Sequence, residues 1–295
     1  MSSAPWDAAL LARIAHLHLR ARNVVDGWRQ GEHRSRRTTS AIEFVDHQEY
    51  APGDPIKYVD WKVAARTDRL VIRRHSAETE VPVTLLLDVS GDLGTEGHGD
   101  ADESKLGTAL IIAATLAVFL QRHGDPVGLE LIGGEDVTHR SIPVGGRTLP
   151  AIMRSLAEVS AGGQANLAEA FDRLGERLPR RSVLILISDL MEEPLEWGPK
   201  VAALVRRGID LRVLHLHDPD EWTLQLQDPS RLYSPEGGDA VPIDPVAARE
   251  AMETVVASYL AEVRGYLGRQ RGQHHLVAYN ESLDGVIRTV LRGRS

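Results

Sequence analysis

Short apolar runs alternate with amphipathic stretches over the last two thirds of the chain. Runs with β-branched residues predict buried strands, and apolar positions three and four apart predict helices. Strands that alternate with helices indicate a mostly parallel sheet covered on both faces. The turn residues 133–136 add an antiparallel edge strand. The predicted strands are Val81–Leu87, Val127–Ile132, Val137–Ile142, Val183–Ile187, Leu211–Leu216 and His275–Tyr279.

The segments between these strands carry helix signals. Ser104 is a suitable N-cap for a helix that runs to about His123. Proline opens the long helix predicted over Pro245–Arg271, where its fixed φ suits the first turn. Further helices are predicted over Leu149–Val159, Asn166–Leu178, Leu195–Arg207 and Leu283–Leu291.

The first 80 residues have a different pattern. An amphipathic helix is predicted over Trp6–Trp28, a polar, basic loop over Arg29–Arg37, and β-like fragments over Ala41–Arg74. We therefore expect a division into residues 1–80, an N-terminal helix with a small β-rich element, and residues 81–295, the α/β domain. Turn residues at 235–238 predict a hairpin insertion at 221–243 within that domain.

Composition narrows the range of functions. The 295 residues carry a formal net charge of −8, which disfavours non-specific binding to nucleic acid. There is no cysteine, which excludes disulfides and thiolate sites and fits a reducing compartment. No signal-peptide pattern is present, and the apolar stretch Leu106–Leu120 is short enough to be a buried helix. We expect a cytoplasmic protein without membrane insertion.

Oxygen-bearing side chains follow two of the apolar strands. Asp88, Ser90 and Asp92 come after the first, and Asp189 comes after the strand Val183–Ile187. Open α/β sheets bind ligands at the carboxyl ends of their strands, so the four converge if these strands are neighbours. Such an oxygen-only set suits Mg²⁺. In the alternative interpretation, Ser90 and Asp92 bond to loop backbone donors and Asp189 caps the following turn.

Several motifs in combination resemble the bacterial family called domain of unknown function 58, which has a von Willebrand factor A-like fold. They include Tyr50-Ala51-Pro52-Gly53-Asp54, Val59-Asp60-Trp61-Lys62, Leu86-Leu87-Asp88-Val89-Ser90, Gly124-Asp125-Pro126-Val127-Gly128-Leu129 and Ile187-Ser188-Asp189. The resemblance implies a doubly wound sheet and a metal-ion-dependent adhesion site at Asp88, Ser90, position 92 and Asp189. It also implies a MoxR-type AAA+ ATPase, or its client, as the protein partner.

Two positions depart from the pattern of that site. Asp92 stands where the family has serine, and Ala165 stands where the threonine ligand would be. Three outcomes follow. In the first, Asp92 compensates and the site holds Mg²⁺, Mn²⁺ or Ca²⁺. In the second, no cation binds and the converging carboxylates repel, so that one stays protonated. In the third, Asp92 points into solvent and no metal binds.

These observations favour a non-enzymatic adaptor that assists assembly or activation of client proteins. Asp88, Asp189 and Trp61 are its candidate partner-binding residues, although packing the β-rich element against the main domain is the more common use for a tryptophan such as Trp61. A structural scaffold with a vestigial metal site is one alternative. A metal-dependent hydrolase is another, but the sequence shows no base for it, no phosphate-binding loop and no nucleophile elbow.

Overall fold

The computed structural model describes residues 8–36, 46–49, 71–74, 81–94, 104–133, 139–223, 230–232, 241–243 and 245–292. The chain divides into two units. One consists of Met1–Trp28 together with Val81–Ser295, and the other is Arg29–Glu80. The first unit holds the large sheet and all of the strand-end acids, so it is the unit that bears on function.

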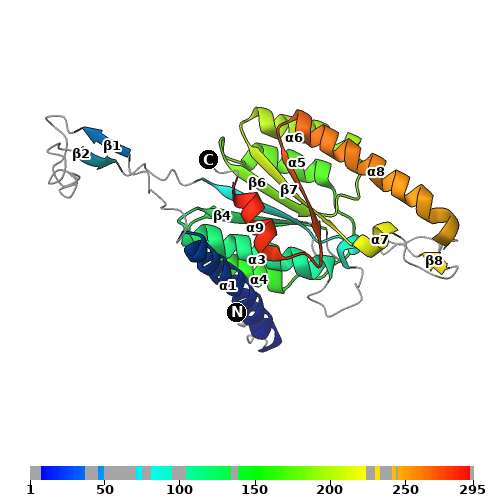
Figure 1. Ribbon diagram of the computed structural model, residues 1–295, viewed down its shortest axis with the longest axis horizontal. Coiled ribbons are helices and arrows are strands. Elements are labelled where there is room, and N and C mark those ends of the chain that lie inside the picture. The colour runs from blue at the N-terminus through cyan, green and yellow to red at the C-terminus, as the bar shows by residue number, and fades with distance from the viewer. Residues whose placement is uncertain are drawn as a thin grey trace, which may run out of the picture. The chain divides into compact units, whose positions relative to one another are not determined.

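A six-stranded sheet forms the centre of the first unit (Figure 1). Its order is β10-β7-β6-β3-β4-β5, and every neighbouring pair is parallel except β4 and β5. This confirms the predicted fold class, a von Willebrand factor A-like, doubly wound sheet with one antiparallel edge strand. The strands are β3 (Val83–Asp88), β4 (Val127–Ile132), β5 (His139–Gly145), β6 (Val183–Ser188), β7 (Asp210–His217) and β10 (Gln273–Ala278).

Helices cover both faces of this sheet (Figure 1). On β3, Leu85 and Leu87 belong to one apolar core and Leu86 to the other, because successive strand residues face opposite sides. The first core includes α1 (Ala8–Arg36), α3 (Lys105–Arg122), α4 (Leu149–Ala157) and α9 (Leu283–Arg292). The second includes α5 (Leu167–Arg177), α6 (Pro194–Arg206) and α8 (Pro245–Arg269). Burial on both faces explains why β3 and β6 are almost wholly apolar, while β4 also buries Glu130, whose carboxylate accepts from the Ser141 hydroxyl.

The helix α3 lies at the centre of the first core. Its predicted cap is confirmed, because the Ser104 hydroxyl accepts a hydrogen bond of 2.9 Å from the Gly107 N–H. Among the described helices, α3 alone is long and apolar enough to cross a membrane, but 78% of that stretch is buried inside the protein. Its apolar character is therefore that of a core helix.

The helix α1 corrects one prediction. It runs without interruption to Arg36, so the loop predicted over Arg29–Arg37 is wrong for residues 29–36. Five of these eight residues are Arg, Gln or Glu, which are good helix formers. A polar composition removes the amphipathic signal but does not end a helix. The earlier turns are anchored in the first core by Leu17, Ala21 and Val25.

Two small antiparallel pairs complete the described structure. In the unit Arg29–Glu80, β1 (Asp46–Glu49) pairs with β2 (Val71–Arg74). In the other unit, the short helix α7 (Pro219–Thr223) follows β7, and β8 (Ser230–Leu232) pairs with β9 (Val241–Ile243). The turn predicted at residues 235–238 and the side chain of Trp61 lie outside the described residues.

Candidate functional site

The predicted acids meet at the point where the strand order reverses. The chain leaves β3 for β4 on one side and later enters β6 on the other side of β3. Asp88 is the last residue of β3, and Asp189 directly follows β6. Both carboxyl groups are buried, as is Ser90. The carboxyl ends of β3 and β6 thus form the crevice in which doubly wound sheets bind ligands.

Asp92 lies in the short 3-10 helix η2 (Gly91–Gly94) and is half-buried. Its negative charge raises the pKa of both Asp88 and Asp189, so it is close enough to belong electrostatically to the same cluster. The structure therefore brings together all four side chains that the sequence singled out at the strand ends. We call Asp88, Ser90, Asp92 and Asp189 the strand-end site.

Hydrogen bonds from the protein engage both carboxylate oxygens of Asp88. Its Oδ1 accepts from the Ser90 N–H at 2.9 Å, and its Oδ2 accepts from the Ser188 hydroxyl at 2.7 Å. The Ser188 hydroxyl oxygen in turn accepts from the Leu190 N–H. Burial raises the pKa of Asp88, and these hydrogen bonds oppose that rise. Asp88 thus ties together the loops that leave β3 and β6.

Lys105 is a member of the site that the sequence interpretation missed. It is the first residue of α3 and is only 5% exposed. Its ammonium lies 3.5 Å from Oδ2 of Asp189 and 2.9 Å from Oε2 of Glu221, which is part of α7. The signal was available in principle: the N-cap Ser104 places a cation in the first helical turn, where the helix dipole disfavours positive charge.

The protonation of Asp189 reflects these neighbours. Burial and, next, the negative charge of Asp88 raise the pKa of Asp189 to about 7, while the charge of Lys105 lowers it. A carboxyl group with such a pKa is poised between its two forms at neutral pH.

The loop before α5 is hydrogen-bonded to the loop after β3, but its residue 165 gives the site no oxygen ligand. The Gly91 N–H donates to the Gly163 carbonyl, and the Gly162 N–H donates to the Val89 carbonyl. Ala165 packs against the second core, and the Asn166 side chain caps α5 by accepting from the Glu169 N–H. This loop supports the site through its backbone.

A family model described as protein of unknown function DUF58 matches residues 46–262, well over half of the chain. The chain belongs to the DUF58 family. Uncharacterized proteins of Mycobacterium tuberculosis and Mycobacterium bovis are similar to it, with 26% identity over 238 residues, or 80% of this chain and 70% of theirs.

Two solved structures are also similar. One is the conserved hypothetical protein BatB from Bacteroides thetaiotaomicron, with 18% identity, a TM-score of 0.47, and 72% of this chain and 98% of that chain covered. The other is the VWA domain of SpRpn10, with 9% identity, a TM-score of 0.44, and 73% and 97% covered.

The donor set of this DUF58 protein does not fit the cation of an adhesion-type site. Asp189 faces an ammonium and position 165 has no oxygen, while each oxygen of Asp88 accepts one hydrogen bond and keeps one lone pair. Within the described parts of the chain, no group of three or more His, Asp or Glu side chains is arranged to hold a metal ion. The described side chains thus suit an ammonium better than a divalent cation.

A histidine cluster on β7 and β10 lies beside this site, and the sequence did not predict that His215 and His274 pair in it. Nδ1 of His215 lies 3.1 Å from Nε2 of His274, and the ring of His217 stacks on Trp222. Burial is the main cause that lowers the pKa of His215 to about 3 and that of His274 to about 4. These rings are neutral at physiological pH, in keeping with a structural role.

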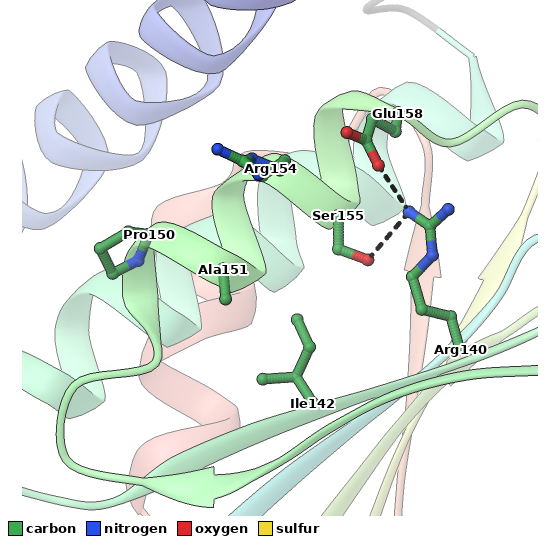
Figure 2. A pocket seen from close by; sticks show the side chains of 7 residues that line it. All are labelled: Arg140, Ile142, Pro150, Ala151, Arg154, Ser155 and Glu158. Carbon is green, nitrogen blue, oxygen red and sulfur yellow. Dashed lines mark hydrogen bonds and ion pairs between the residues drawn. The ribbon is translucent and has the colours of Figure 1, made fainter. Parts of the chain in front are cut away.

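A separate hollow lies between the edge strand β5 and α4 (Figure 2). Arg140 lies at one end of it, with Nη1 2.9 Å from Glu158 Oε2 and 3.5 Å from the Ser155 hydroxyl. The remaining lining is Ile142, Pro150, Ala151 and Arg154. Because Arg140 is paired with Glu158, this hollow offers less chemistry than the strand-end site.

Proposed function

We propose that this DUF58 protein is a cytoplasmic, non-enzymatic interaction module that works with a MoxR-type AAA+ ATPase in the assembly or activation of client proteins. Its contact surface is the face around the strand-end site, an adhesion-type site altered at positions 92 and 165. The observation that carries the proposal is an exposed apolar pair, Met191 and Leu195, in the segment that directly follows Asp189.

This apolar pair has the character of a contact surface. Met191 is 67% exposed and Leu195 is 63% exposed, whereas the preceding residue Leu190 is buried in the second core. Large apolar side chains beside a polar cluster are typical of protein-binding sites, and methionine adapts to the shape of a partner.

The segment that carries the pair is held on several sides. The Tyr259 hydroxyl donates to the Leu190 carbonyl, and the Trp197 indole N–H donates to the Glu192 carbonyl at 3.2 Å. The Glu192 carboxylate accepts from the Leu167 N–H at 2.7 Å. Because the backbone is fixed before binding, ordering it costs little free energy when a partner arrives.

The test is a binding measurement with the purified MoxR-type ATPase of the same organism, by biolayer interferometry. We expect binding by the native chain and a loss of about tenfold or more in affinity for Met191→Ser/Leu195→Ser, because exposed apolar anchors dominate such interfaces. The matched control is Leu11→Ser/Leu19→Ser on α1, which alters side chains that are 45% and 59% exposed.

The control variant should bind like the native chain. Circular dichroism checks that both variants are folded. Equal affinities of all three proteins would place the contact elsewhere, and no binding by the native chain would contradict the proposed partner.

A further inference from the structure

The ammonium of Lys105 contacts carboxylates from two separate parts of the chain. Asp189 follows β6, and Glu221 belongs to α7 after β7, so the two residues that it contacts are brought together by the fold alone. Asp88 and Asp92 act electrostatically on Asp189 and complete the cluster. Two acids therefore contact this positive charge, and two more act on one of those acids.

Buried carboxylates need such a charge. Asp88 and Asp189 are almost fully buried at the ends of neighbouring strands, and like charges in that setting disfavour each other's ionised form. An unpaired buried charge is costly, and pairing with an ammonium offsets that cost. The buried Lys105 supplies the positive charge that a divalent cation supplies in other sites built from carboxylates.

The position of Lys105 in its helix supports this interpretation. As the first residue of α3 it lies at the positive end of the helix dipole, where anions are favoured. The first turns of α5 and α6 follow the usual preference and carry Glu169 and Glu196. The acids that Lys105 faces offset the unfavourable interaction between its ammonium and the helix dipole. The position of Lys105 is therefore explained by the strand-end site.

We propose that the Lys105 ammonium is the resident cation of the strand-end site, which is therefore complete without a metal ion. A lysine ammonium is a compact point charge on a flexible stem and accepts carboxylates from several directions, as a metal ion does. A divalent cation close to Asp189 would meet this positive charge. Glu221, which is 41% exposed, closes the cluster on its solvent side.

The proposal concerns the free protein and is independent of its partner. It is tested by a double-mutant cycle of thermal unfolding with the native chain, Lys105→Met, Asp189→Asn and the double variant. Each protein is measured in a metal chelator and again with millimolar Mg²⁺ or Mn²⁺. The control cycle uses Lys200 and Asp172, a pair on the surface with 2.5 Å between Nζ and Oδ2.

We expect the unfolding temperature to fall in Lys105→Met and to recover by at least half in the double variant. The control pair should show little coupling, because exposed ion pairs are screened by water. Magnesium and manganese should leave the unfolding temperature of the native chain unchanged.

Two results would overturn the proposal. One is a coupling between Lys105 and Asp189 no larger than that of the control pair. The other is a saturable rise in the unfolding temperature of the native chain with either cation that Asp88→Asn abolishes. The second measurement needs no lysine variant, so the proposal can fail even if Lys105→Met does not fold.

Discussion

Among the described residues, two cations are buried, one on the helix α3 and one on the strand β7, and they are held in different ways. Arg212 on β7 donates from Nε and Nη2 to a single carboxylate, that of Asp210, at 3.1 Å and 2.6 Å. Its Nη1 donates to the backbone carbonyl of Val290 on α9. Lys105 bonds to carboxylates only among its described contacts, and these come from two separate elements.

The difference shows how the geometry of a buried cation indicates its role. The planar guanidinium of Arg212 directs its donors along fixed lines, so it joins α9 to β7 through one carbonyl and one local acid. The ammonium of Lys105 has no such fixed plane and lies where strand ends converge. We interpret Arg212 as a structural tie and Lys105 as the charge of a site.

The largest expected effect comes from Arg212→Met. The variant leaves the Val290 carbonyl without its donor and should cost about 4 kcal/mol in the free energy of unfolding, measured by urea denaturation. Adding Asp210→Asn should not restore stability, because Asp210 is 39% exposed and water solvates its charge. If the double variant recovered half of the unfolding free energy that Arg212→Met loses, Arg212 would behave like Lys105 and the contrast between them would not hold.

A smaller effect is expected from Gly133→Ala, which tests how tightly the strand-end site is built. Gly133 has a φ of +78°, and a Cβ there would lie 2.8 Å from the backbone nitrogen of Ser90. The control is Gly124→Ala, with a similar φ of +84° and no atom within 4 Å of the added Cβ.

Both substitutions strain the backbone by about 1 kcal/mol. Gly133→Ala should cost about 1 kcal/mol more in urea denaturation, because the neighbour is backbone and cannot turn away. Equal losses would mean that the loop at Ser90 moves freely to accept a side chain.

The smallest expected effect is a dependence on pH. His274 has a pKa of about 4 in the folded chain, below its ordinary value of 6.5, chiefly through burial and then through the charges of Arg264 and His275. The unfolded chain therefore binds more protons between these values, so the contribution of His274 is present above pH 6.5 and is lost as the pH falls towards 4.

His274→Gln should consequently lose less stability than the native chain between pH 7.5 and pH 5.5. The difference is expected to be about 0.5 kcal/mol, because the ring is half-exposed and water screens its charge. Urea denaturation at the two pH values measures it. Asp189, whose raised pKa acts in the opposite direction, is common to both proteins and cancels in the comparison. If the native chain lost no more unfolding free energy than the variant between these pH values, the lowered pKa of His274 would be contradicted.

The sequence predicted those features that depend on local pattern and on the doubly wound topology. The strands β3 and β6 are continuous apolar runs, and parallel neighbours bring their carboxyl ends together, so the meeting of Asp88 with Asp189 could be anticipated. For Lys105 the Ser104 cap indicated only a cation in the first turn of α3, because the direction of its side chain depends on how α3 packs. The pairing of His215 with His274 depends on the register between two strands far apart in the chain.

The central claim, that the strand-end site carries its own cation, is tested most directly by calorimetric titration of the chelator-treated native chain with Mg²⁺, Mn²⁺ and Ca²⁺. The account predicts no saturable binding of any of them up to millimolar concentration. Saturable binding that disappears in Asp88→Asn would contradict it and would show that Asp92 compensates for the oxygen missing at Ala165.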